Sequence, residues 1–159
     1  MGHDKTLELG SADNPFRIMP PRVVMLLLVA ATVVHLVLRL PVRSLSVPLG
    51  VVLVCLGLVL NIWADALFRR AHTPVRPGER PERLIAQGPF RVTRNPMYLG
   101  MIVSLVGIAV LTGSWPFWAA PALLFLVVSR YYIPFEESQM QGRFGRDYAD
   151  YRRRVRRWV

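Results

Sequence analysis

Three long stretches without a formally charged side chain place the strongest limit on how this chain can fold. They cover residues 23–38, 47–64 and 95–129 of a sequence of 159 residues. An α-helix needs about 20 predominantly apolar residues to cross the hydrocarbon core of a bilayer, within a range of roughly 17 to 25. The third stretch is therefore too long for one crossing and long enough for two short ones.

The third stretch is interrupted near its middle by Gly-Ser-Trp-Pro at positions 113–116. Glycine and proline are typical of turns, and Trp115 and Trp118 are of the kind that gathers at membrane–water interfaces. We therefore expect a helical hairpin that turns between Thr112 and Pro116. The sequence predicts an all-α integral membrane fold with four transmembrane helices, of which the third and fourth form this hairpin.

The composition favours a membrane protein over a nucleic-acid binder. Hydrophobic residues make up 53% of the chain, and the formal net charge is +10. A nucleic-acid binder shares such a charge but lacks long apolar runs, whereas a basic membrane protein is attracted to anionic lipid. We expect membrane lipids as partners and no nucleic acid. Cys55 is the single cysteine, so no intrachain disulfide can form, and no His/Cys cluster has the spacing of a metal site.

The arginines are distributed unequally between the predicted loops. Seven lie within 66–94 and seven within 133–159, whereas the loop after the first helix has only Arg39 and Arg43 and the turn at 112–116 has none. Cytoplasmic loops carry the excess of Lys and Arg. We therefore expect both termini and the loop 66–95 on the cytoplasmic side, as in a protein of a bacterial-type inner membrane.

The whole chain, 1–159, is predicted to form one domain. A polar segment covers 1–21, the cytoplasmic loop covers 66–95, and an amphipathic helix is expected over 138–159. Apolar residues recur in this last segment at steps of 4, 4, 3, 4 and 3, which is a helical period, and arginines occupy the other positions, as in helices that lie in the membrane interface. The apolar positions are Met140, Phe144, Tyr148, Tyr151, Val155 and Trp158.

The sequence Arg-Asn-Pro at 94–96 stands directly before the third stretch. Asn95 suits a helix N-cap and Pro96 the first helical position. A helix start favours an anion, and Arg94 adds positive charge. The hairpin returns Glu136 and Glu137 to the same membrane face, which places a site for a cation beside one for an anion.

S-adenosylmethionine, which carries a carboxylate, an ammonium and a sulfonium, would suit such a pocket. A plainer interpretation is also open. The arginine can be an interfacial anchor beside a helix cap, and the paired glutamates can be a solvated helix face.

Several spaced motifs resemble one family. The order R-N-P-x-Y-x-G, a hydrophobic hairpin, E-E and F-G-x-x-Y-x-x-Y-x-x-x-V-x-R-W is similar to that of the integral-membrane methyltransferases, which include isoprenylcysteine carboxyl methyltransferase and phospholipid N-methyltransferases. The resemblance covers roughly residues 68–158. Many relatives have histidine where this chain has Asn95, so the prenylcysteine specificity does not transfer directly. The matching residues are Arg94, Asn95, Pro96, Tyr98, Gly100, Glu136, Glu137, Phe144, Gly145, Tyr148, Tyr151, Val155, Arg157 and Trp158.

This resemblance implies methyl transfer from S-adenosylmethionine, at the cytoplasmic membrane face, to an amphiphilic or lipid-like acceptor with a carboxylate, an amine or a thiol. Glu137 and Arg157 are the expected catalytic residues: a glutamate to take a proton from an amine acceptor, and the arginine to orient an acidic one. The alternative is a non-catalytic membrane protein that binds lipid or assists assembly. The expected cofactor-binding residues are Arg94, Asn95, Pro96, Tyr98, Gly100, Glu136, Glu137, Tyr148 and Tyr151.

Three further polar or small-residue features favour structural roles over chemical ones. Asp65 and Arg69 are four residues apart and are expected to form a pair near a helix end. His35 is expected to make a hydrogen bond to a neighbouring helix. The small residues Gly100, Ser104 and Gly107 share one helix face, which favours close helix packing.

Overall fold

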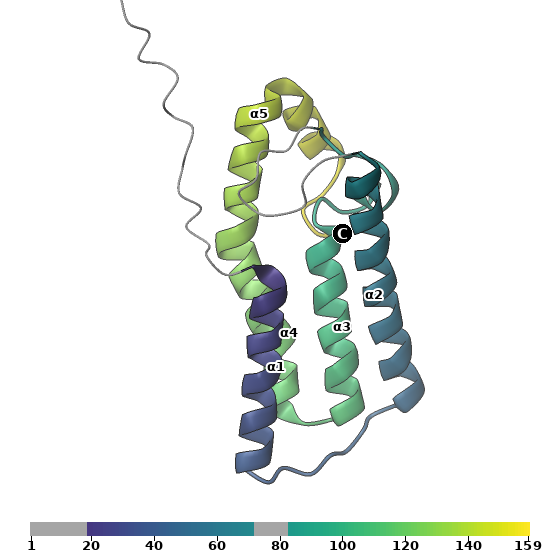
Figure 1. The fold of residues 1–159 in the computed structure, drawn as a ribbon, viewed down its shortest axis with the longest axis vertical. Helices are drawn as coiled ribbons and strands as arrows, with labels where there is room; N and C mark the ends of the chain where they lie inside the picture. Colours follow the sequence, from purple (N-terminus) through teal and green to yellow (C-terminus); the bar gives the residue numbers. More distant parts are fainter. Residues whose placement is uncertain (1–18, 72–82) are drawn as a thin grey trace, which may run out of the picture.

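The computed structural model describes residues 19–71 and 83–159, and within these ranges the chain is helical with no strand beyond a single bridge (Figure 1). This confirms the all-α prediction. α4 runs through the π-helical turn η2 directly into α5. The elements are α1 (Pro20–Val37), α2 (Val47–Arg70), the 3-10 turn η1 (Gly88–Arg91), α3 (Pro96–Thr112), α4 (Trp115–Val127), η2 (Val128–Tyr132) and α5 (Ile133–Arg154).

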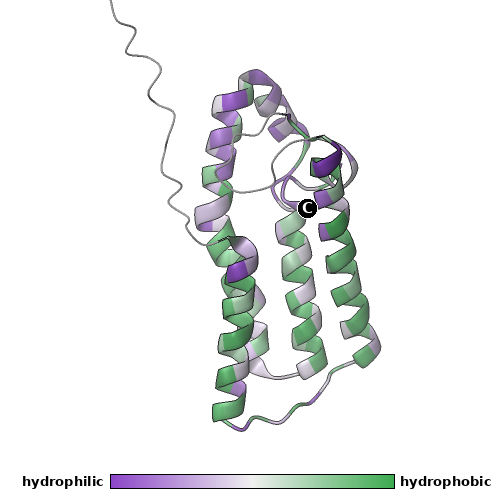
Figure 2. Ribbon diagram, in the orientation of Figure 1, coloured by the Kyte–Doolittle hydropathy of each residue, from purple (hydrophilic) through white to green (hydrophobic). Residues whose placement is uncertain are grey.

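The four apolar helices pack as neighbours in the order α1, α4, α3 and α2. The α1–α2 connection and the α3–α4 turn lie at one end of the bundle, and η1, most of α5 and the C-terminus lie at the other (Figure 1). Hydrophobic residues dominate the four packed helices, whereas hydrophilic residues gather on α5 (Figure 2). The candidate site residues are at this second, polar end.

The hairpin between α3 and α4 forms where the sequence predicted it. α3 ends at Thr112, and α4 begins at Trp115 with Pro116 in its first turn. Gly113 has a φ of 60°, and a Cβ there would collide with the carbonyl group of Arg43. Only glycine meets both requirements at low cost, so this residue fixes the turn against the α1–α2 connection.

Small residues bring α2 and α3 close together, as the predicted packing stripe required. A Cβ on Gly100 would lie 2.7 Å from the carbonyl oxygen of Gly57, and one on Gly107 would lie 2.8 Å from that of Gly50. Both distances are too short for a real side chain. The stripe therefore allows backbone-to-backbone contact, which is a common way for helices to pack in a membrane.

Three helices within the described ranges are long and apolar enough to cross a membrane. They are α1, α2 and the continuous helix from Trp115 to Arg154, whereas α3 is apolar but has 17 residues. Length and composition therefore support three crossings. They do not by themselves establish the predicted fourth.

The cytoplasmic loop expected over 66–95 begins later than predicted. α2 continues to Arg70. Near this end, Asp65 accepts a 2.7 Å hydrogen bond from Nε of Arg69, which confirms the predicted helix-end pair. Residues 72–82 of this loop lie outside the described residues, as does the polar segment up to residue 18. The expected contact of His35 is also confirmed, because its Nδ1 is 3.0 Å from Oγ of Ser114, the N-cap of α4.

The amphipathic helix expected over 138–159 differs at both ends. It begins at Ile133 as a continuation of α4, bends at Gly145, which has a φ of 49°, and ends at Arg154. Val155 is extended, and the backbone of Arg156 pairs with Thr93. The helical period continues through Trp158, but bonding to residues 93–95 replaces the hydrogen bonds that a further helical turn would make.

Candidate active site at the polar end of the bundle

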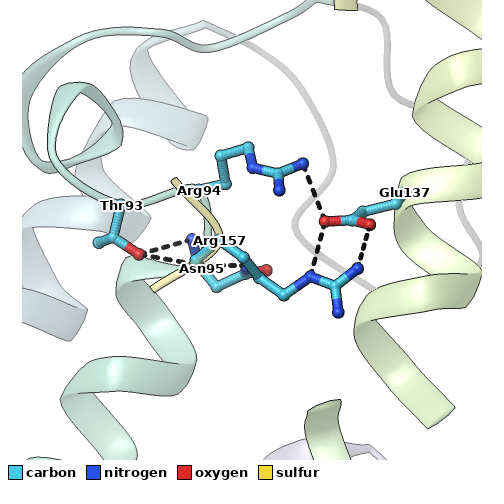
Figure 3. Close-up of polar contacts among 5 residues, drawn as sticks. All are labelled: Thr93, Arg94, Asn95, Glu137 and Arg157. Carbon is cyan, nitrogen blue, oxygen red and sulfur yellow. Dashed lines mark hydrogen bonds and ion pairs between the residues drawn. The ribbon is translucent and has the colours of Figure 1, made fainter. Parts of the chain in front are cut away.

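Glu137 lies between two arginines that come from distant parts of the chain (Figure 3). Arg94 approaches from the segment before α3, and its Nη1 is 2.9 Å from Oε1 of Glu137. Arg157 approaches from the C-terminal end and donates twice, from Nε to Oε1 at 3.1 Å and from Nη2 to Oε2 at 2.6 Å. Planar guanidinium groups suit such paired contacts with a carboxylate, so Glu137 joins the two arginines.

At the Glu137 contact, positive charge exceeds negative charge. Two guanidinium groups share one carboxylate, and the side chains of Arg94 and Glu137 are each only 10% exposed. Hydrogen bonding to Glu137 raises the pKa of Arg157, against the opposing effect of burial. Arginine side chains stay protonated in proteins, so an anion of a ligand would compensate the second guanidinium group.

Arg94 also has unused hydrogen-bonding capacity. Its Nε and Nη1 are buried and have no partner with hydrogen-bond geometry within the described part of the chain, although Nη1 remains within ion-pair distance of Glu137. An unsatisfied buried donor costs free energy. A ligand carboxylate that accepts from Arg94 would remove that cost.

The segment 93–95 is attached to the end of the chain (Figure 3). Oγ1 of Thr93 and Nδ2 of Asn95 both donate to the carbonyl oxygen of Arg157, at 3.1 and 2.9 Å. The predicted N-cap role of Asn95 is therefore only partly correct. Asn95 occupies the N-cap position and Pro96 begins α3, but the Asn95 side chain makes no capping hydrogen bond because its amide is directed to Arg157.

Glu136 has a different environment from Glu137. The hydroxyl group of Tyr98 donates to its Oε1 at 2.6 Å, and the ring of Tyr132 lies 6.4 Å from that of Tyr98. Both tyrosines belong to the apolar core cluster. Glu136 thus bonds to a residue of this core, although it is next to Glu137 in the chain.

Two of the other expected site residues adjoin the Arg94–Glu137 contact: Tyr148 interacts with both Arg94 and Glu137, and Tyr151 interacts with Arg94. Tyr148 and Tyr151 are buried in a cluster with Val155, and the Tyr151 hydroxyl donates to the carbonyl of Phe90 at 2.8 Å. Gly100 faces α2. The site residue that sequence reasoning missed is Thr93, a small polar residue whose position before Arg-Asn-Pro gave no signal of its contact 64 residues away.

The comparisons with known proteins identify the family. The model of the phospholipid methyltransferase family matches residues 45–147, which is more than half of the chain. The chain belongs to this family. The matched part of this phospholipid methyltransferase family member includes Arg94 and Glu137, whereas Arg157 follows it.

The relatives agree with this assignment. The chain is 30% identical over 112 residues to protein-S-isoprenylcysteine O-methyltransferase B of Arabidopsis thaliana, covering 67% of this chain and 55% of that protein. It is 32% identical over 111 residues to a probable protein-S-isoprenylcysteine O-methyltransferase of Oryza sativa, covering 67% and 56%. An uncharacterised protein of Haemophilus influenzae is 30% identical over 63 residues, 40% of this chain and all of that one.

The chain spans about half the length of the plant methyltransferases that it matches. No solved structure matches it. The family and the apolar helices together fit an integral membrane protein.

Proposed function

We propose that this protein transfers a methyl group from S-adenosylmethionine to an amphiphilic or lipid-like acceptor at the cytoplasmic face of a bacterial-type inner membrane. The acceptor group is a carboxylate, an amine or a thiol, and the acceptor approaches sideways from the bilayer between the helices. The family assignment supports the reaction class. The arrangement around Arg94 supports the choice of donor.

The observation that carries this proposal is the buried, incompletely bonded guanidinium group of Arg94. It lies beside the start of α3, where the side chain of the N-cap residue Asn95 makes no capping hydrogen bond. Helix N-termini and arginines both favour carboxylates. In our proposal, Arg94 and the residues that form this helix start, Asn95 and Pro96, hold the carboxylate of the amino-acid part of the donor.

The other expected site residues have roles around this anchor. Glu136, bonded to Tyr98, faces the cationic part of the donor, and Glu137 keeps both arginines in place. Tyr148 and Tyr151 close the side where the adenine would lie, and Gly100 lets α3 approach α2 at the edge of the site. Bound S-adenosylmethionine supplies a methyl group on a positively charged sulfur, and the protein contributes mainly alignment.

The acceptor decides which further residues act. An amine acceptor must lose a proton, and a carboxylate of the pair Glu136–Glu137 is the group placed to take it. A carboxylate acceptor needs no base, and Arg157 would orient it with the face of its guanidinium group that Glu137 does not cover, since this side chain is 38% exposed.

The proposal also includes the orientation in the membrane. We propose four crossings, with α3 as the short fourth one, and with both termini and the site on the cytoplasmic side. The donor is made in the cytosol, and the polar end of the bundle holds the site, α5 and the C-terminus. The excess of arginine at this end agrees with the positive-inside rule.

Binding of the donor to the purified protein tests the proposal. Calorimetric titration of the detergent-solubilised protein with S-adenosylmethionine should give saturable binding, and S-adenosylhomocysteine should compete for the same site. A folded protein that binds neither compound would favour the non-catalytic alternative. Transfer of a labelled methyl group to lipid extracts would then identify the class of acceptor.

A further inference from the structure

The last five residues, 155–159, leave the helical pattern and return to the site. We refer to them as the C-terminal segment. α5 ends at Arg154, Val155 has the extended dihedral angles φ −121° and ψ 130°, and the chain then runs back to the start of α3 (Figure 1). The ring of Trp158 packs against that of Phe125 on α4, with 5.0 Å between centroids. The segment is therefore held at both of its ends.

Hydrogen bonds fix the alignment of the C-terminal segment with residues 93–95. The amide of Arg94 donates to the carbonyl oxygen of Arg156 at 3.0 Å. Thr93 and Asn95 then place two side-chain donors on one further carbonyl oxygen, that of Arg157. Thr93 is 2% and Asn95 9% exposed. Because unpaired buried polar groups are costly, a shift of one residue in this alignment is strongly disfavoured.

This alignment is coupled to the charged site. Thr93 and Asn95 direct their side chains to the C-terminal segment, while Arg94 between them reaches Glu137 (Figure 3). Arg157 offers its carbonyl to the first two residues and its guanidinium group to the same Glu137. These contacts connect residues 93–95, Arg157 and Glu137 to one another. The position of Arg157 therefore depends on the hydrogen bond that its carbonyl oxygen accepts from the side-chain amide of Asn95.

We propose that Asn95 is a positioning residue, which acts through the Arg157 carbonyl to align the C-terminal segment and so places Arg157, Glu137 and Arg94 for the donor. This inference rests on the proposed function, because the site that is positioned is the donor site. It differs from a capping role. A cap needs a side chain that accepts a hydrogen bond, whereas positioning needs one that donates.

Two substitutions of Asn95 that differ in donor capacity separate these roles. Asn95→Asp replaces the donating amide by a carboxylate, which repels the Arg157 carbonyl but remains a good N-cap. Asn95→His restores an N–H donor on a ring. Affinity for S-adenosylmethionine is measured by calorimetry, and docking of the C-terminal segment by hydrogen exchange of peptides that contain residues 93–95 and 155–157.

We expect Asn95→Asp to weaken donor affinity about tenfold or more and to speed exchange in both peptides. Asn95→His should restore slow exchange and most of the affinity. Gln141→Glu is the matched control, because the Gln141 amide also donates to a backbone carbonyl, that of Gly145, but does so at the surface. That variant should behave as the parent does. If Asn95→Asp does not fold, Thr93→Val removes the other donor to the same carbonyl and should show a smaller loss in both measurements.

The outcomes distinguish this inference from the proposed function. Parent-like donor affinity in Asn95→Asp overturns the positioning role, and so does equal weakness of Asn95→His and Asn95→Asp. Faster exchange without any loss of affinity also overturns it, because docking of the segment would then have no effect on the donor site. A parent protein that binds no S-adenosylmethionine overturns the proposed function itself, whatever the exchange pattern.

Discussion

At the scale of single residues, Glu137 is the centre of the site because both of its oxygens are engaged by arginines. A carboxylate that bonds two guanidinium groups holds them at fixed positions. Its neighbour Glu136 instead accepts a hydrogen bond from the hydroxyl group of Tyr98. Adjacent residues of the same type can thus have separate roles, one structural for the site and one facing the ligand.

Removing the charge of Glu137 tests this arrangement. Glu137→Gln would leave Arg94 buried without a counter-ion and beside Arg157, so we expect the free energy of unfolding to fall by about 3–5 kcal/mol. Thermal unfolding in detergent measures the loss. Donor affinity should fall in the same variant, because Arg94 would no longer be held in place.

Asp150→Asn is the matched control, since it makes the same change in an ion pair at the surface. Asp150 pairs with Arg153, and their side chains are 53% and 79% exposed. Exposed pairs contribute only about 0–1 kcal/mol. Equal effects of the two substitutions would show that burial and the double contact of Glu137 are unimportant.

The sequence predicted which residues gather at the site better than it predicted their contacts. Arg94 and the glutamates reach the same end because a hairpin of two apolar helices must return the chain there. The contact between Glu137 and Arg157 depends on the extended backbone after Arg154. The helical period of the apolar residues predicted a helix there instead. The hydrogen bond from Thr93 to the Arg157 carbonyl depends on that same segment.

At the scale of elements, the closest helix contact is the one between α2 and α3. Gly57 lies against the backbone of α3, and a Cβ at this position would be 2.8 Å from the amide nitrogen of Ser104. Backbone atoms cannot rotate away from such a contact. The two helices must therefore move apart if any side chain is added.

Gly57→Ala should lower the free energy of unfolding by roughly 1–3 kcal/mol, which is typical of overpacking. The midpoint of thermal unfolding in detergent measures this loss. Gly142→Ala is the control, because a Cβ there meets nothing within 4 Å and alanine favours a helix over glycine. A Gly57→Ala variant as stable as Gly142→Ala would contradict the close packing.

The elements themselves were largely predictable from the sequence. Apolar runs and the Gly-Ser-Trp-Pro turn located α1 to α4, since hydrophobic length and turn residues act locally. The length of α2 and the end of α5 were not predictable in this way. α2 continues through charged residues to Arg70, and α5 ends where tertiary hydrogen bonds to residues 93–95 replace helical ones.

At the scale of the whole molecule, the two ends of the bundle differ in charge and in chemistry. The α1–α2 connection and the α3–α4 turn form one end, and the site and the C-terminus form the other (Figure 1). If the arginine-rich end is cytoplasmic, as the positive-inside rule indicates, a fluorescent protein fused after Val159 should be active. Alkaline phosphatase at the same position should be inactive.

A fusion made after Ser44, between α1 and α2, is the control for this orientation, because it should give the reverse result. Active phosphatase after Val159 would place the C-terminus outside the cytosol. That outcome would contradict both the orientation and a site supplied with a cytosolic donor.

The most direct test of the account is the donor affinity of Arg94→Lys beside that of the parent protein. Lysine keeps the positive charge but lacks the planar group and the buried Nε–H, which has no hydrogen-bond partner among the described residues. The account predicts that calorimetric affinity for S-adenosylmethionine falls about tenfold, the equivalent of one charge-assisted hydrogen bond, in a variant of matched thermal stability. Equal affinities would show that Arg94 is an interfacial anchor and would contradict its assignment to the donor site.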